Sequence, residues 1–176
     1  MNQPERLFGY PRKIAYYAIL TSLAFVLSAA EALIPIPAPA PGVKLGLANT
    51  VTLFLLLDEH NPVYALIVTI MRCVLVSFAL GALSVLLYSL AGGIVSCLVM
   101  WILLHFDNTF SVMGASVAGA LAHNFSQLAA ASFIARDPAI FSYFPVLLVT
   151  GAAAGCATGY IAFKARNILR TIAKNK

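Results

Sequence analysis

The chain has 176 residues, of which 61% are hydrophobic and only 10% are charged, and its mean hydropathy is +0.92. This composition excludes an ordinary soluble domain and indicates a multi-pass membrane protein. The net charge is +5, but eight of the eleven Lys and Arg residues lie in residues 1–13 and 164–176. Such clustering at the ends is a topology signal, so we expect no nucleic-acid partner.

Six hydrophobic segments predict an all-α membrane protein, a bundle of six transmembrane helices that forms one domain over residues 1–176. By the positive-inside rule both termini are cytoplasmic, which agrees with an even number of spans in the cell membrane. The second span is short and is expected to begin below the outer surface. The expected spans are residues 14–33, 45–57, 63–80, 83–105, 112–134 and 146–163.

A proline-rich loop joins the first two spans. Alternating prolines stiffen this segment into an extended rod, and a glycine and Lys44 follow where the next span begins. The simplest interpretation is a rigid surface loop with a snorkelling lysine. The functional interpretation is a lid over a binding site, formed by Pro35, Pro37, Pro39, Pro41 and Gly42.

Polar side chains from five spans gather in the outer half of the predicted bundle. A charged side chain at mid-bilayer costs roughly 2.5–3.5 kcal/mol, so a shared pocket open to the outside explains this bias. His123 and Gln127 share one helix face, with Asn124 beside it. The candidate ligand-binding residues are Glu31, Lys44, Asn49, Arg72, Tyr88, Ser89, His123, Asn124 and Gln127.

Two alternatives to a ligand site apply to these residues. Arg72 and Glu31 could form a buried structural ion pair, alone or beside a pocket. Metal binding is not expected, because a single histidine lies at this depth and the nearby arginine repels cations. Cys73, Cys97 and Cys156 lie in apolar runs and predict small buried side chains, not disulfides or zinc ligands.

Small residues four apart on the first span allow another helix to approach closely. Ala18 and Ser22 are therefore either packing residues of the bundle or a docking surface for a separate membrane subunit.

Several motifs resemble one membrane protein family, the Gx transporter family, whose members often carry the older label heptaprenyl diphosphate synthase component I. The motifs are Glu31 with Ile34-Pro35, residues 41–49 (PGVKLGLAN), Arg72, residues 89–93 (SLAGG) with Ser96, and Gly119-Ala120 with His123-Asn124 and Gln127. They cover residues 14–130. Phe125-Ser126 departs from the Ile-Gly that is common in the family, which changes a packing face only.

This family is in turn similar to the substrate-binding S components of energy-coupling factor transporters. The resemblance implies a six-helix protein that holds a vitamin-like ligand beneath the loop joining its first two helices. It also implies that Ala18 and Ser22 contact a transmembrane coupling subunit, which works with separate ATPases. The chain itself has no GxxxxGK[ST] loop for ATP.

Two functions are therefore weighed. The first is a substrate-binding subunit of an importer, which needs no cofactor and takes a flavin-like ligand or a quinone or isoprenoid precursor. The second is a membrane accessory subunit of heptaprenyl diphosphate synthase. Catalysis by this chain alone is not expected, because that reaction needs clustered aspartates for magnesium and the chain has only the dispersed Asp58, Asp107 and Asp137.

Overall fold

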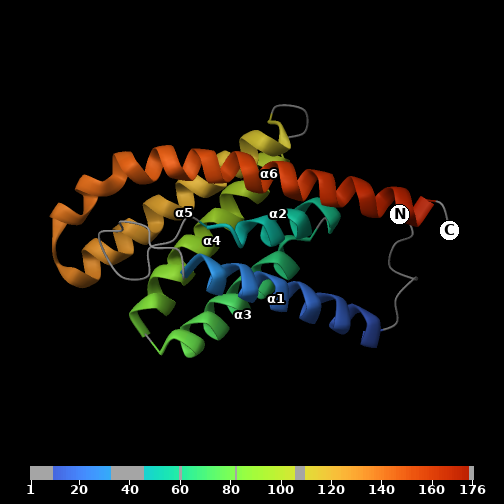
Figure 1. The fold of residues 1–176 in the computed structure, drawn as a ribbon, viewed down its shortest axis with the longest axis horizontal. Helices are drawn as coiled ribbons and strands as arrows, with labels where there is room; N and C mark the ends of the chain where they lie inside the picture. The colour runs from blue at the N-terminus through green and yellow to red at the C-terminus, as the bar shows by residue number, and fades with distance from the viewer. Residues whose placement is uncertain (1–9, 33–45, 60, 82, 106–109, 175–176) are drawn as a thin grey trace.

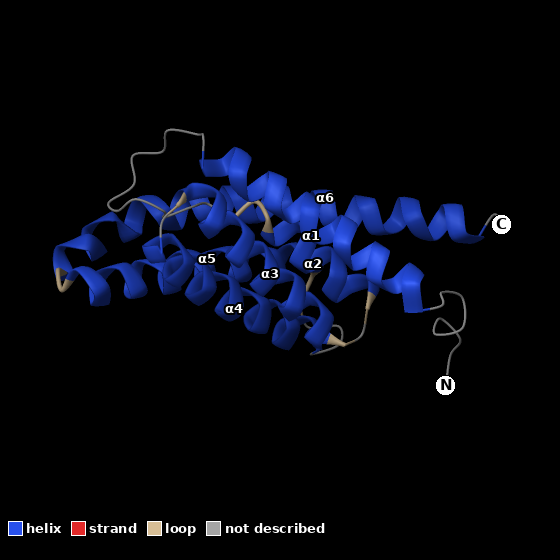
Figure 2. Ribbon diagram, turned by 90° about the horizontal axis from the view of Figure 1, so that it is seen from below, coloured by secondary structure: helices blue, strands red, loops and turns tan. Residues whose placement is uncertain are grey.

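The structure is a computed structural model that describes residues 10–32, 46–59, 61–81, 83–105 and 110–174, and all regular structure in these ranges is helical (Figures 1 and 2). This confirms the predicted all-α fold of six helices, with a 3-10 helix (η1) between the last two. The elements are α1 (Tyr10–Ala32), α2 (Asn49–Asp58), α3 (Pro62–Leu80), α4 (Leu83–His105), α5 (Val112–Ala135), η1 (Pro138–Tyr143) and α6 (Phe144–Lys174).

The helix ends follow from local sequence signals. Asn61 accepts a hydrogen bond from the Val63 N–H at 3.0 Å, and Pro62 takes the first position of α3, one residue before the expected span. Gly81 ends α3 in the left-handed region with φ of 66°. Ser111 caps α5 by accepting from the Gly114 N–H at 3.0 Å.

Two segments differ from expectation because a helix continues through them. The first span is expected to begin at residue 14, but α1 already begins at Tyr10. Helix α6 does not end near Phe163 but continues to Lys174. The extension contains no Gly or Pro, and Ile168, Leu169 and Ile172 alternate with its basic residues, so nothing in the sequence stops the helix.

Among the described residues, four helical segments are long and apolar enough to cross a membrane: residues 11–32, 62–80, 86–105 and 138–172. Their length and composition are compatible with the predicted multi-pass membrane protein. Helix α2 has 10 residues, about 15 Å, which is half the thickness of the hydrocarbon core. Helix α5 has 24 residues, but its polar side chains lower its hydropathy and it is not among the four. The count of six spans remains a prediction.

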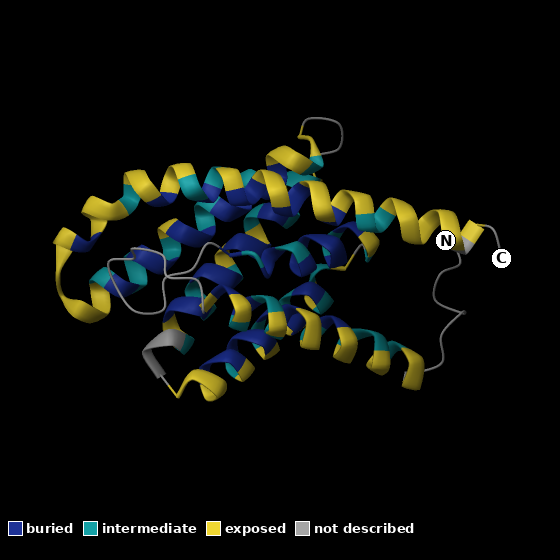
Figure 3. Ribbon diagram, in the orientation of Figure 1, coloured by how far each residue is buried: buried dark blue, intermediate teal, exposed yellow. Residues whose placement is uncertain are grey.

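The chain directions of the helices alternate, so that α1 begins and α6 ends at the same end of the bundle (Figure 1). Helix α2 contacts each of the other five helices, and most of its residues are buried. By contrast, α1 and α6 expose one side along most of their length (Figure 3). The short α2 is therefore the centre around which the long helices pack.

The buried start of α2 is closed by a carboxylate from the end of α1. The Gly46 and Leu47 N–H groups donate to the two carboxylate oxygens of Glu31, at 2.6 and 3.2 Å. Gly46 adopts a φ of 85°, and its missing Cβ leaves room for Asn49 and His123. These two N–H groups belong to the turn before α2, and the first N–H groups of α2 bond to carbonyls of that turn. The negative charge of Glu31 faces the positive end of the helix dipole.

The hydrophobic core consists of two clusters of buried side chains. The larger includes Leu53 and Leu55 of α2, Val68 of α3 and Met100 of α4. The smaller contains Tyr88, Leu128, Ala131, Ile140 and Leu147. Helices α3, α4 and α5 also carry buried polar residues, such as Arg72, Ser89 and Gln127. In the sequence of each helix they lie between or beside the residues of the two clusters. A polar layer therefore lies inside the bundle, between two apolar regions.

We expect Glu31→Gln to destabilise the fold by about 1–3 kcal/mol, because an amide supplies one acceptor oxygen where the carboxylate supplies two, and it lacks the charge. The thermal unfolding midpoint of the purified protein measures this. The matched control is Glu59→Gln, since partly exposed Glu59 accepts a single bond from the Tyr17 hydroxyl at 2.8 Å. Equal losses in the two variants would contradict the capping role of Glu31.

We expect Gly155→Ala to destabilise the packing of α5 against α6. A Cβ at residue 155 would stand 2.7 Å from the Val117 Cα, a backbone atom that cannot move aside alone. Overpacking of this kind costs about 1–3 kcal/mol. In Gly114→Ala the added Cβ would stand 3.3 Å from the Ser111 hydroxyl oxygen, so this control should unfold close to the wild-type temperature. An equal fall in the unfolding midpoints of Gly155→Ala and Gly114→Ala would refute the close contact between α5 and α6.

Candidate functional site

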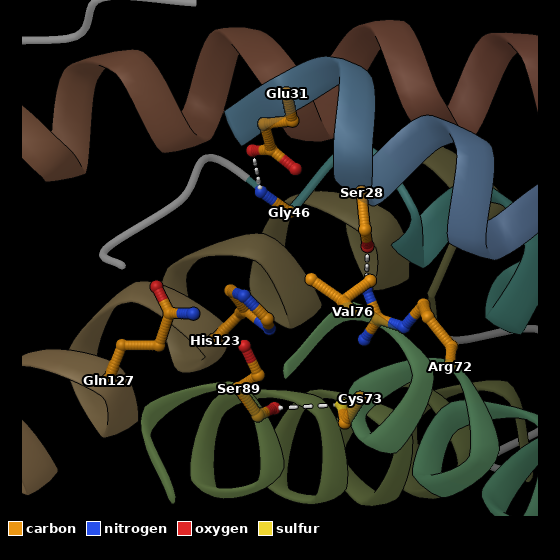
Figure 4. Close-up of a pocket in the computed structure, with 9 residues that line it drawn as sticks. All are labelled: Ser28, Glu31, Gly46, Arg72, Cys73, Val76, Ser89, His123 and Gln127. Atoms are coloured by element: carbon orange, nitrogen blue, oxygen red, sulfur yellow. Dashed lines mark hydrogen bonds between the residues drawn. The ribbon is translucent and has the colours of Figure 1, made fainter. Parts of the chain in front are cut away.

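A small cavity lies where the end of α1, the start of α2 and the middle of α3, α4 and α5 meet (Figure 4). Its volume is about 10 Å³, roughly the space that one water molecule needs. The lining residues are Ser28, Glu31, Gly46, Arg72, Cys73, Val76, Ser89, His123 and Gln127. Residues far apart in the sequence thus form one polar site, closed around a water-sized space.

Arg72 is the only arginine or lysine among the described residues that line the cavity, and just 4% of it is exposed. Its Nη1 donates to the Ser28 hydroxyl at 3.1 Å, so it bonds to α1 one turn before Glu31. Within the described part of the chain, Nε and Nη2 have no hydrogen-bond partner. The guanidinium therefore keeps two buried donors without an acceptor, and the pairing with Glu31 that we considered is not among its hydrogen bonds.

Two glycines of α4 give the polar side chains their room. A Cβ at Gly92 would stand 2.7 Å from the Gln127 Cγ and 2.9 Å from the His123 Cε1. A Cβ at Gly93 would stand 3.1 Å from the Arg72 Nη2. Side chains of α5 and α3 thus reach the backbone of α4 at successive residues, and this requires the Gly-Gly pair.

The remaining walls are held by bonds between helices. The Cys73 thiol donates to the Ser89 carbonyl at 3.3 Å and ties α3 to α4. Glu31 forms the opposite wall in Figure 4, with an oxygen on the Gly46 N–H. The cavity therefore offers a guanidinium, an imidazole, an amide and hydroxyl groups, together with a carboxylate that already accepts backbone bonds.

Five of the predicted ligand-binding residues line the cavity: Glu31, Arg72, Ser89, His123 and Gln127. Three others point elsewhere. Asn49 donates to the Ser96 hydroxyl at 3.0 Å, and Asn124 donates to the Leu147 carbonyl at 2.9 Å. Tyr88 packs in the smaller apolar cluster. Lys44 and the predicted lid residues Pro35, Pro37, Pro39, Pro41 and Gly42 lie outside the described residues.

Four lining residues were not among the predicted ligand-binding residues, and each had a local signal. Ser28 lies one turn before Glu31, and Val76 lies one turn after Arg72. Gly46 belongs to the glycine-containing segment before the second span, and Cys73 adjoins Arg72. Helical spacing from the charged residues would have found Ser28 and Val76.

The predicted docking residues lie on the outer side of α1. Ala18 and Ser22 are both exposed, and the Ser22 hydroxyl donates to the Ala18 carbonyl at 2.9 Å. Because this bond satisfies the hydroxyl within the helix, the face presents small side chains without an unmet polar group.

Comparison with known proteins gives one match. No curated protein and no solved structure matched the chain. The family described as heptaprenyl diphosphate synthase component I matches residues 20–164, which include every residue that lines the cavity. The chain belongs to the heptaprenyl diphosphate synthase component I family.

Proposed function

We propose that this chain is the membrane substrate-binding subunit of an importer of the energy-coupling factor type. It captures a small vitamin-like, anionic or aromatic ligand from outside, with both termini in the cytoplasm, and it is not catalytic alone. The observation that carries this proposal is the buried Arg72, which has two donors without acceptors beside a cavity lined from four helices.

The energetics of Arg72 favour a ligand over a purely structural role. A buried charge costs several kcal/mol unless an opposite charge and hydrogen bonds compensate for it. The single bond that Arg72 makes goes to a neutral hydroxyl. An apolar residue of similar volume would stabilise the bundle better, so the charge is better explained by a ligand that supplies the missing acceptors.

The volume of the cavity bears on how a ligand binds. About 10 Å³ is far below the roughly 300–1,000 Å³ of ordinary small-molecule sites. Binding therefore includes an opening movement. The start of α2 is the element that we expect to move, because two N–H bonds to Glu31 are its attachment to α1 at this point.

A second candidate is a membrane accessory subunit of heptaprenyl diphosphate synthase, with the catalytic residues on a partner. The family description is the observation that favours it. The cavity would then either bind part of a prenyl substrate or contribute to assembly with the catalytic partner. The chain would bind that partner and would not import a ligand.

The decisive experiment is mass spectrometry of small molecules that co-purify with the detergent-extracted protein. We expect one vitamin-like compound at near-stoichiometric amounts. Gln127→Met should reduce its occupancy, with an affinity loss of roughly tenfold for a lost polar contact. Thr171→Ala, on an exposed face of α6, is the control and should retain it. Prenyl diphosphate turnover by the chain alone, or no bound compound, would refute the importer role.

Docking to a coupling subunit is tested separately on α1. We expect Ala18→Leu with Ser22→Leu to abolish pull-down of a co-expressed transmembrane coupling subunit, because two large side chains prevent close helix approach. Ligand occupancy should not change. Ala157→Leu enlarges an exposed alanine of α6 and controls for a general effect of bulk. Pull-down that survives the α1 substitutions would contradict docking at this face.

A further inference from the structure

We propose that the cavity binds an oxyanion, a carboxylate or phosphate group of the ligand, held side-on by the Nε and Nη2 donors of Arg72. This rests on the proposed function and specifies the chemical class of its ligand. It follows from which guanidinium donors are used and which are not.

The hydrogen bonds of Arg72 leave one complete edge of the guanidinium available. Nη1 donates to the Ser28 hydroxyl, whereas Nε and Nη2 are buried without a partner in the described part of the chain. These two nitrogens share one edge of the planar group, and their N–H bonds are parallel. Two parallel donors match the two oxygens of a carboxylate or phosphate. The Ser28 bond fixes the plane of the group and so orients this edge.

The charges around Arg72 also favour an anion from outside the chain. Glu31 is the one carboxylate among the lining residues that the structure describes. Its oxygens accept from the Gly46 and Leu47 N–H groups, and its charge faces the positive end of α2. The guanidinium charge is therefore not neutralised by a hydrogen-bonded carboxylate. A cationic group would meet repulsion from Arg72, whereas an oxyanion gains both charge and donors.

The available space suits the head of such a ligand. One carboxylate oxygen is close in size to a water molecule, and the cavity holds about one. The missing side chain at Gly93 leaves Nη2 room beside α4. An oxyanion head can enter with a local shift of the walls, while the remainder of a larger ligand requires the opening of the α2 start.

The test measures thermal unfolding of the full chain in detergent through its single tryptophan, Trp101, at constant ionic strength. The probes are sodium acetate, sodium benzoate, inorganic phosphate and dihexanoyl phosphatidylglycerol, with acetamide and benzamide as neutral isosteres of the carboxylates. These arms separate a carboxylate, a free phosphate and a lipid phosphate. We expect a saturating rise in the unfolding midpoint with at least one oxyanion and none with the amides.

Two substitutions of Arg72 and one control assign the effect. Arg72→Lys keeps the charge but loses the parallel donors, so apparent affinity should fall at least about tenfold. Arg72→Met removes the charge, so it should abolish the response while folding at least as well as the wild type. Arg166→Lys is the matched control, because Arg166 also has a buried Nε without a partner but does not line the cavity. It should respond like the wild type.

Each result decides the proposal. Saturating shifts with an oxyanion that Arg72→Lys and Arg72→Met both lose would support it. Equal shifts with carboxylates and amides, an unchanged response in Arg72→Lys, or no response to any oxyanion would overturn it. Other results would contradict the importer function without contradicting the oxyanion site, or the reverse. A neutral compound that co-purifies overturns the oxyanion site but leaves the importer, whereas oxyanion binding without coupling-subunit pull-down leaves the site but not the importer.

Discussion

The structure depends on how the buried start of α2 is satisfied. A short helix that begins inside an apolar bundle has N–H groups that water cannot reach, and each unmet group there costs several kcal/mol. The N–H groups of Asn49, Thr50 and Val51 bond to carbonyls of the preceding turn. Glu31, in the last turn of α1, accepts the N–H groups of Gly46 and Leu47 in that turn. Because α2 contacts all five other helices, this carboxylate fixes the element on which their packing is centred. The wall of the cavity that holds Glu31 is a consequence of the same bond.

The polar layer has a defined place in this packing. The hydrophobic core consists of apolar clusters on either side of it, and Arg72, His123 and Gln127 belong to neither cluster. Buried polar residues destabilise a membrane protein, so their presence outside the apolar clusters calls for another role. The apolar clusters and the polar layer are thus separate along α3, α4 and α5, although they share the same helices.

The sequence predicted the helices well because apolar runs, caps and prolines determine them locally. Both ends of α4 match the predicted residues, and α3 ends at the predicted Leu80 after beginning one residue before the predicted span. The site was predicted less completely, since neighbouring polar residues on one helix can face different partners. His123 lines the cavity, whereas Asn124, one residue later and about 100° around the helix, bonds to α6. The capping role of Glu31 was not predictable, because its partners are backbone N–H groups that no side-chain pattern marks.

The Gly-Gly pair of α4 has a consequence for reading related sequences. Gly92 and Gly93 set the spacing of three helices, since the side chains packed against them come from α5 and α3. A chain that packs its helices this way needs both glycines. A related sequence with larger residues at these two positions would therefore have to space α3, α4 and α5 differently, and the polar side chains between them would lie farther from α4.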